Sequence, residues 1–224
     1  KYVPIDINKA IYYYTLAVNQ MYEKSINNLA MIYYEGKYIK RDIKKAIQYL
    51  LLIENQKNPA ILNNLGFLYI SAFDIPHNKE KAIHYFTLAA DKNNITSQHT
   101  LGLFYYEGYN VPQDINKAIY YFTLAANQND PFSQYYLGII YYSGKYVPKD
   151  FEKALKYLTK SASRNFSDAQ LYLGNIYLEG KYVKRDINKA IHFFKELSSF
   201  DISYAKNNLG VIYSNGFEGI KKNI

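Results

Sequence analysis

The dipeptide Lys-Ala recurs in this chain at a constant interval of 36 residues. Its six copies begin at Lys9, Lys45, Lys81, Lys117, Lys153 and Lys189. A fixed period of about 20 to 50 residues is typical of stacked repeat proteins, in which each copy packs against its neighbours. The period therefore predicts one repeat array with a continuous core, although 224 residues would ordinarily suggest one or two globular domains.

Four further columns of residues keep the same period. The first is aromatic: Tyr13, Tyr49, Tyr85, Tyr121, Tyr157 and Phe193. The second is Leu throughout: Leu29, Leu65, Leu101, Leu137, Leu173 and Leu209. The residue after this Leu is small: Ala30, Gly66, Gly102, Gly138, Gly174 and Gly210. The fourth column is Tyr: Tyr33, Tyr69, Tyr105, Tyr141, Tyr177 and Tyr213.

Each copy is predicted to contain two helices. Ser25, Leu29 and Tyr33 are spaced four apart and therefore share one face of a first helix. A Gly follows this helix in most copies and suits the left-handed conformation that ends a helix. These glycines are Gly36, Gly108, Gly144, Gly180 and Gly216. Ala72 replaces the Gly once, so the turn there is predicted to differ.

The second helix has its own start and stop signals. An acidic or amide side chain can accept hydrogen bonds from the unpaired amides of a first turn. The expected caps are Asp42, Asp114, Asp150 and Asp186, with Asn78 in the remaining copy. Asn tolerates the left-handed conformation, so the helix is predicted to end near such a residue. The Asn residues at this place are Asn93, Asn129 and Asn165.

The small residue beside each Leu predicts close packing. Gly inside a helix costs about 1 kcal/mol relative to Ala, so its repetition predicts that two helix backbones approach closely there. The Tyr columns are expected to fill the gaps between helix pairs, with phenol oxygens reaching the edge for a hydrogen bond.

The copies divide the chain at regular positions. We expect a partial unit at 1–20, full units at about 21–56, 57–92, 93–128, 129–164 and 165–200, and a partial unit at 201–224. The partial units would hold a lone second helix at roughly 6–19 and a lone first helix at roughly 202–215. The opening Lys-Tyr-Val-Pro matches residues 145–148, which indicates a segment of a longer array. Neither end carries the polar face that normally caps such arrays, so end-to-end self-association is expected.

The repeated unit resembles a known family. Its pattern is Ala-x-x-x-Leu-Gly-x-x-Tyr-x-x-Gly, a loop with Val, and then Asp-x-x-Lys-Ala, as in residues 169–190. This pattern is similar to the Sel-one-like repeat (SLR), a relative of the tetratricopeptide repeat, and it covers essentially the whole chain. The resemblance implies an all-α fold, an α/α solenoid that winds as a right-handed superhelix. The unit at about 57–92 departs from the pattern because it lacks the loop Gly and the capping Asp.

Signals for catalysis, cofactors and membrane spanning are lacking in the sequence. The chain has no Cys, which excludes disulfides and thiolate metal sites and fits a reducing compartment such as the cytoplasm. The four His residues occupy scattered positions, and Gly-rich phosphate loops, nucleophile elbows and HExxH motifs do not occur. No apolar run approaches the roughly 18 residues that span a bilayer. We expect no enzyme activity, no metal and no cofactor.

The variable positions of the first helix carry the functional prediction. In related arrays this helix lines the concave face. One variable column reads Asn27, Asn63, His99, Tyr135, Leu171 and Asn207. The next reads Met31, Phe67, Leu103, Ile139, Asn175 and Val211. The third reads Tyr34, Ile70, Tyr106, Tyr142, Leu178 and Ser214.

These columns predict a groove with an apolar floor and amides near both ends. An Asn amide can both donate to and accept from a peptide bond, and Tyr and Phe are good anchors for a partner. The expected contact residues are Asn27, Met31, Tyr34, Asn63, Phe67, His99, Leu103, Tyr106, Tyr135, Ile139, Tyr142, Asn175 and Asn207. Some of them could instead pack against the neighbouring unit, and Asn28, Asn64 and Asn208 could face either way.

The predicted function is a non-catalytic scaffold or adaptor that binds a peptide or protein segment, as the resemblance also implies. A first alternative follows from the net charge of +8, because loop lysines and arginines could form a basic edge for acidic polymer or nucleic acid. The same edge could simply be solvated, and nucleic acid is not the expected partner. A second alternative is an enzyme like cysteine-rich bacterial relatives to which penicillin binding is ascribed, although their paired cysteines are missing here.

Overall fold

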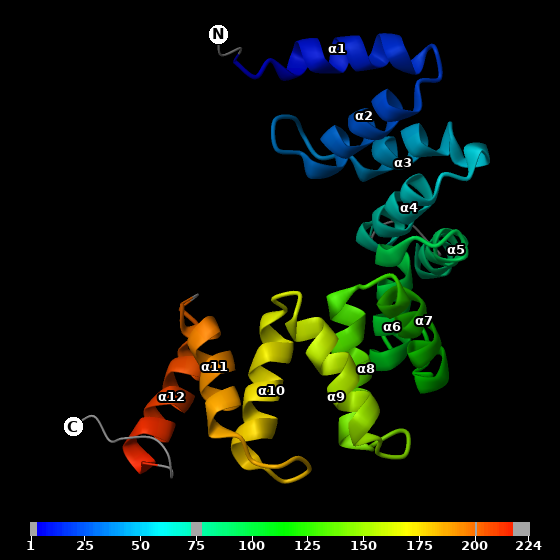
Figure 1. Cartoon of the computed structure of the whole chain (residues 1–224). Coiled ribbons are helices and arrows are strands. Elements are labelled where there is room, and N and C mark those ends of the chain that lie inside the picture. Colours follow the sequence, from blue (N-terminus) through cyan, green and yellow to red (C-terminus); the bar gives the residue numbers. More distant parts are fainter. Residues whose placement is uncertain (1–3, 73–77, 200, 217–224) are drawn as a thin grey trace. The chain divides into compact units, whose positions relative to one another are not determined.

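The computed structural model describes residues 4–72, 78–199 and 201–216 (Figure 1). The chain divides into two compact units, unit 1 at residues 1–114 and unit 2 at residues 115–224, and each is described by itself. The described residues form twelve α-helices and one short 3-10 helix, with no strand among them.

In both units each helix packs against the next along the chain. Unit 1 contains α1 (Ile7–Val18), α2 (Glu23–Glu35), α3 (Ile43–Leu51), η1 (Glu54–Gln56), α4 (Pro59–Ser71), α5 (Asn78–Ala90) and α6 (Ile95–Glu107). Unit 2 contains α7 (Ile115–Asn127), α8 (Pro131–Ser143), α9 (Phe151–Ala162), α10 (Ser167–Glu179), α11 (Ile187–Ser198) and α12 (Ser203–Asn215). Figure 1 shows the pairing, for example α2 beside α3 and α10 beside α11. The predicted all-α repeat solenoid is confirmed.

The turn after each first helix follows its glycine. The backbone is left-handed at Gly36, Gly108, Gly144, Gly180 and Gly216, with φ between 60° and 74°. Ala72 ends α4 with φ −98° and ψ 78°, so the different turn predicted there is confirmed.

Asp residues begin several second helices, as predicted. The side chains of Asp42, Asp150 and Asp186 accept hydrogen bonds of 2.9 to 3.0 Å from the backbone amides three residues later. The cap expected at Asn78 is wrong. This residue is the first of α5 itself, and its side-chain oxygen is buried without a hydrogen-bond partner among the described residues.

The turn before each first helix is left-handed whatever residue stands there. The predicted cases, Asn93, Asn129 and Asn165, have φ of 62°, 68° and 60°. The same position in the other copies is Met21, Lys57 and Asp201, with φ of 56°, 52° and 62°. Packing of the helices on either side therefore imposes this conformation even on residues that do not favour it.

The Lys-Ala dipeptide and the two Tyr columns meet in one motif. In four helix pairs the two aromatic columns stack with centroids 5.5 to 6.3 Å apart: Tyr33–Tyr49, Tyr69–Tyr85, Tyr141–Tyr157 and Tyr177–Phe193. The ammonium groups of Lys45, Lys81, Lys153 and Lys189 lie 4.3 to 5.2 Å from the centroid of the first-helix Tyr. The Ala after each of these lysines is fully buried. In this dipeptide the Ala side chain is therefore part of the core, and the Lys side chain makes a cation–π contact with a tyrosine ring.

Side chains of the second helix lie nearest to Gly66, Gly138 and Gly174, a contact that the prediction of two approaching backbones did not include, and at Gly138 the backbone oxygen of Ala154 also lies 3.4 Å from an added Cβ. A Cβ atom added at Gly66 would lie 2.7 Å from the Phe86 ring, and one at Gly174 would lie 2.5 Å from the Phe194 ring. At Gly138 the side chain of Leu158 fills the same space. The second helix therefore inserts a large side chain against the glycine of the first helix.

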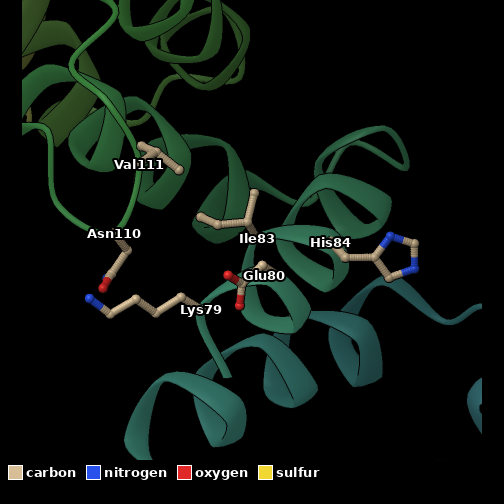
Figure 2. A pocket seen from close by; sticks show the side chains of 6 residues that line it. All are labelled: Lys79, Glu80, Ile83, His84, Asn110 and Val111. Carbon is tan, nitrogen blue, oxygen red and sulfur yellow. The ribbon is translucent and has the colours of Figure 1, made fainter. Parts of the chain in front are cut away.

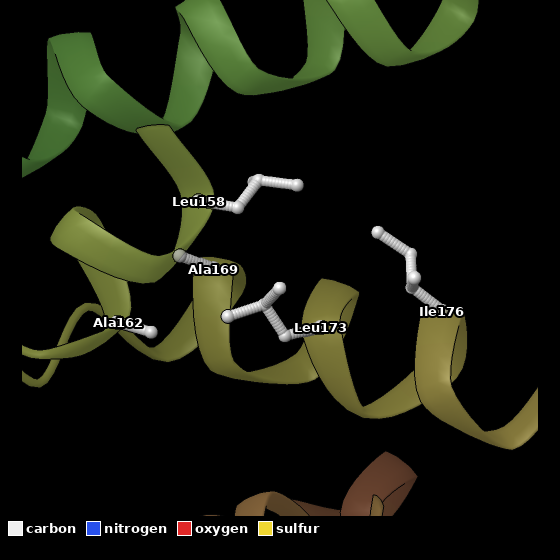
Figure 3. Close-up of a cluster of buried hydrophobic side chains, with 5 residues drawn as sticks. All are labelled: Leu158, Ala162, Ala169, Leu173 and Ile176. Atoms are coloured by element: carbon white, nitrogen blue, oxygen red, sulfur yellow. The ribbon is translucent and has the colours of Figure 1, made fainter. Parts of the chain in front are cut away.

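Large apolar side chains of the second helix meet small and branched residues of the following first helix (Figure 3). Leu158 and Ala162 of α9 form a buried cluster with Ala169, Leu173 and Ile176 of α10. Burial of apolar surface stabilises by about 25 cal/mol per Å². This cluster holds one face of α10 in the core, and Leu171 and Leu178 of its variable columns pack partly against the next cluster along the chain.

Candidate functional site

In unit 1 the variable columns of α2 and α4 share a hollow. Met31 and Tyr34 of α2 line it together with Asn64, Phe67 and Leu68 of α4, and its volume is about 160 Å³. Phe67 is 36% exposed, and its ring also meets the buried Phe86 ring edge to face at 5.0 Å. Three residues of the predicted stripe, Met31, Tyr34 and Phe67, are thus brought together.

Polar side chains hold α2 and α4 at the distance that forms this hollow. Asn64 Nδ2 donates to Asn27 Oδ1 at 2.9 Å. The Tyr34 hydroxyl and the Ser71 hydroxyl are 3.4 Å apart. The Asn27 side-chain oxygen therefore supports the wall of the hollow, and the Asn64 side chain faces the preceding repeat.

Asn63 does not lie on the exposed stripe, contrary to prediction. Its side chain is only 9% exposed, and its Oδ1 accepts a hydrogen bond of 2.8 Å from the Ser97 hydroxyl. This buried bond fastens α4 to α6. Asn63 is therefore left out of the candidate surface, and replacing it would test stability rather than binding.

The remaining predicted residues of unit 1 lie on α6. His99, Leu103 and Tyr106 are half-buried, and the hollow between α2 and α4 does not include them. Gln113 Nε2 donates to the Tyr106 carbonyl oxygen at 2.7 Å, which ties the following loop to the end of α6.

Unit 2 has a second hollow on its first helices. Tyr142 of α8 lines it together with Tyr172, Asn175, Ile176 and Glu179 of α10, and its volume is about 180 Å³. The Tyr142 and Tyr172 rings meet edge to face at 5.3 Å. Burial, and then the nearby charge of Glu179, raise the pKa of the Tyr142 phenol, so it remains a neutral donor at physiological pH.

The other predicted residues of unit 2 take different places. The Tyr135 ring contacts Phe166 at 5.4 Å and Tyr172 at 6.3 Å, and Ile139 packs partly against the core. Asn175 Oδ1 accepts from Asn208 Nδ2 at 3.0 Å, while Asn207 is exposed on α12. Tyr135 and Ile139 therefore back the hollow rather than line it.

The sequence prediction missed Tyr172 and Glu179. Tyr172 belongs to the column of Asn28, Asn64 and Asn208, which could face either way. The variability of that column was the available signal. Glu179 ends α10 immediately before Gly180, where an exposed acidic residue carries little information.

Comparison with known proteins decides the family. The model of the Sel1 repeat matches residues 1–20, 24–57, 61–94, 95–130, 131–166, 167–199 and 203–224. The chain belongs to the Sel1 repeat family. No curated protein matches it in a sequence search.

Solved Sel1 repeat structures share the fold. A protective antigen of uropathogenic Escherichia coli with an SLR fold is 25% identical, with a TM-score of 0.87, over 99% of this chain and 47% of that one. A Sel1 repeat protein from Oxalobacter formigenes is 27% identical, with a TM-score of 0.81, over 94% and 61%. The immunity protein PA5088 from Pseudomonas aeruginosa, 19% identical with a TM-score of 0.57 over 90% and 76%, supports the fold alone. The present chain thus spans about half the length of the E. coli protein.

The Sel1 array has few groupings of reactive side chains in its described part. No cluster of three or more His, Asp or Glu residues that could hold a metal occurs there. His192 Nε2 lies 3.4 Å from Glu196 Oε1 at the surface, and His77 falls outside the described residues. Within the described ranges, no helix has the length and apolar character needed to cross a bilayer.

The loop lysines of the Sel1 units lie over neighbouring tyrosines. Lys37, Lys145 and Lys181 place their ammonium groups 4.6 to 5.1 Å from the ring centroids of Tyr38, Tyr146 and Tyr182. These contacts give the loop lysines a structural role, since each lysine covers an aromatic face.

Proposed function

We propose that this protein is a non-catalytic scaffold that binds a segment of another protein on the first helices of its repeats. Sel1 repeat proteins are generally protein-interaction scaffolds and are typically non-catalytic. The observation that carries the proposal is the hollow formed by Met31, Tyr34 and Phe67 between α2 and α4. Its apolar lining is exposed at positions that differ from copy to copy.

The chemistry of this hollow suits an apolar side chain of a partner. The unbranched thioether of Met31 adapts to different shapes. Phe67 offers an exposed ring face, and Tyr34 adds a ring with a polar end, which is the combination enriched at interface hot spots. The hydrogen bonds Asn64–Asn27 and Tyr34–Ser71 fix the walls, so little ordering entropy is lost on binding.

The hollow of unit 2 offers a more polar contact of the same kind. Tyr142 and Asn175 supply a phenol and an amide beside the carboxylate of Glu179. Such groups can hydrogen-bond the backbone of an extended or helical segment whatever its side chains are. We propose this hollow as a second contact, tested independently of the first.

The test uses peptides selected from a random library on the immobilised protein. Affinities of the selected peptides are then measured for the wild type, for Phe67→Ser and for Tyr120→Ser. Tyr120 is 57% exposed on α7, a second helix, and serves as the matched control. We expect a loss of about tenfold or more, equivalent to about 1.4 kcal/mol, for Phe67→Ser alone.

Two outcomes would contradict the proposal. Equal losses for Phe67→Ser and Tyr120→Ser would mean that the first helices are not the binding face. Selection of strongly acidic peptides whose binding falls steeply with added salt would favour the basic loop edge instead.

We also propose end-to-end self-association through α12 of one copy and α1 of another. Gly210 on α12 has no atom within 4 Å of an added Cβ, whereas Gly66 and Gly174 are covered by Phe86 and Phe194. Tyr14 occupies the corresponding column on α1, so its ring would cover Gly210 of a second copy. The exposed rings of Tyr12 and Tyr13 lie on the same helix.

Light scattering over a range of concentrations tests the association. The expected result is a mass that rises with concentration in the wild type. The mass of Gly210→Phe should stay at 26.2 kDa, because the phenylalanine ring would fill the space that Tyr14 of a second copy would occupy. A strictly monomeric wild type would contradict this proposal and leave the peptide-binding proposal untouched.

A further inference from the structure

A tyrosine of one inter-helix loop, Tyr182, packs against the preceding repeat. In unit 2 the ring of Tyr182 stacks on Phe151, the first residue of the preceding second helix, with centroids 4.0 Å apart. The edge of Tyr142 meets the same ring at 5.5 Å, and the ammonium groups of Lys149 and Lys181 lie 5.4 and 5.1 Å from its centroid. Phe151, Tyr142, Lys149 and Lys181 thus form a site for a phenol ring, here called the ring seat.

The corresponding seat in unit 1 lacks its ring. The equivalent positions lie two repeats earlier in the sequence, and each repeat has 36 residues. Lys79 is equivalent to Phe151, and Asn110 is equivalent to Tyr182. The tyrosine of this loop stands one residue earlier, at Tyr109. Its ring contacts Phe104 of the same repeat, with ring centroids 5.6 Å apart. Asn110 adopts the left-handed conformation, with φ 65°.

A hollow of about 410 Å³ lies beside Lys79 and Asn110 (Figure 2). Small-molecule pockets commonly have volumes of about 300 to 1,000 Å³. Its lining residues are Lys79, Glu80, Ile83, His84, Asn110 and Val111.

The side chains around this hollow combine an apolar floor with polar ends. Ile83 and Val111 form the floor. Figure 2 shows the Lys79 and Asn110 side chains pointing toward one another, the Glu80 carboxylate nearer to Ile83, and the His84 side chain directed away from them. Asn110 Nδ2 is buried and has no hydrogen-bond partner among the described residues, so a donor stands ready for a ligand acceptor.

We propose that this hollow binds a tyrosyl side chain of another polypeptide. The ring would lie on Ile83 and Val111, with the Lys79 ammonium over its face as Lys149 and Lys181 lie over Tyr182. The phenol hydroxyl would donate to the Glu80 carboxylate and accept from Asn110 Nδ2. This site lies on α5 and the loop that follows α6, apart from the hollow of Met31, Tyr34 and Phe67, and does not rest on the function proposed for that hollow.

The direct test titrates the protein with N-acetyl-tyrosinamide while methyl NMR signals are followed. We expect saturable shifts at the methyl groups of Ile83 and Val111. N-acetyl-leucinamide should bind about tenfold more weakly or worse, because it lacks both the ring face and the hydroxyl. Absence of shifts with the tyrosine probe, or equal binding of the leucine probe, would overturn the proposal.

A loop variant tests whether the vacancy is the site. Tyr109→Lys with Asn110→Tyr rebuilds the Lys-Tyr-Val-Pro sequence found at 145–148, and Lys79→Phe supplies the stacking partner. The triple variant should melt at a higher temperature and lose binding of the tyrosine probe. A folded triple variant that binds the probe with unchanged affinity would show that the ring seat is not the binding site.

A single substitution, Glu80→Gln, tests the site independently of whether the triple variant folds. Glu80→Gln leaves the hollow in place and removes only the charged acceptor. It should weaken the tyrosine probe while leaving N-acetyl-phenylalaninamide unaffected. An equal effect on both probes would overturn the assigned role of Glu80 and, with it, selection for tyrosine.

Discussion

The Phe86 ring fills the space in which a side chain at Gly66 would lie. An added Cβ would be 2.7 Å from two atoms of that ring, and Phe86 is fully buried. The pairing recurs between Gly174 and Phe194. It explains why a residue that costs about 1 kcal/mol in a helix is kept at this position.

Replacing Gly66 by Ala should therefore destabilise the protein. We expect a loss of about 1 to 3 kcal/mol, because a buried ring must move to admit the methyl group. The matched change Gly210→Ala should be neutral or gain up to about 1 kcal/mol, since an added Cβ there meets nothing within 4 Å. Urea unfolding of dilute protein measures both, and equal effects at the two sites would contradict the ring-on-glycine explanation.

The left-handed turn at Lys57 offers a stabilising substitution. Its φ of 52° costs an ordinary side chain about 1 kcal/mol, so Lys57→Gly should raise the free energy of unfolding by up to about that amount. Lys156→Gly, on the exposed side of α9, should lower it by about 1 kcal/mol and serves as the control. A loss of stability in Lys57→Gly would show that the lysine side chain itself holds the turn.

The hydrogen bond between Ser97 and Asn63 should matter to stability. Ser97→Ala leaves the buried Asn63 oxygen without its donor, and we expect a loss of about 1 to 3 kcal/mol. Ser133 occupies the same column, but its buried hydroxyl has no hydrogen-bond partner among the described residues. Ser133→Ala should therefore be neutral or stabilising. Chemical denaturation distinguishes the two, and a neutral Ser97→Ala would contradict the assigned role.

Tyr85 should make the protein sensitive to alkaline pH. Burial, and then the hydrogen bond of 2.8 Å from its hydroxyl to Glu54 Oε1, raise the pKa of this phenol above its usual range. Above about pH 10 the unfolded state loses the proton while the folded state keeps it, so stability falls as pH rises.

Comparison with Tyr85→Phe isolates this effect. Between about pH 10 and 11.5 the wild type should lose stability faster than the variant, by up to about 1.4 kcal/mol per pH unit. Measurement of both proteins at pH 7 gives the separate cost of losing the bond to Glu54. Parallel pH profiles would show that Tyr85 is not responsible.

Much of the fold follows from the period of the sequence. The helix pairs, the left-handed glycines and the caps at Asp42, Asp150 and Asp186 were predictable because each depends on a local preference of the residue itself. Met21 and Lys57 were not predictable as left-handed residues. Their conformation is set by packing on both sides, which no local preference reveals.

The candidate surface was predictable only in part, since helix spacing gives a face but not its neighbour. Met31, Tyr34 and Phe67 share a hollow because α2 and α4 lie side by side. Asn63 belongs to the same stripe but is turned to Ser97 of α6, and that partner comes from another repeat. Predicting it would have required the offset between consecutive repeats, which spacing within one helix does not contain.

The displacement of one tyrosine to Tyr109 has a consequence for protein engineering. Loops that keep the regular tyrosine, such as those of Tyr38 and Tyr146, differ from the open loop by little more than a one-residue shift. Transplanting the Tyr-Asn order into a chosen loop should open a matching vacancy there. Repeating this substitution in chosen loops should then place side-chain binding sites in selected repeats without a change in the helices.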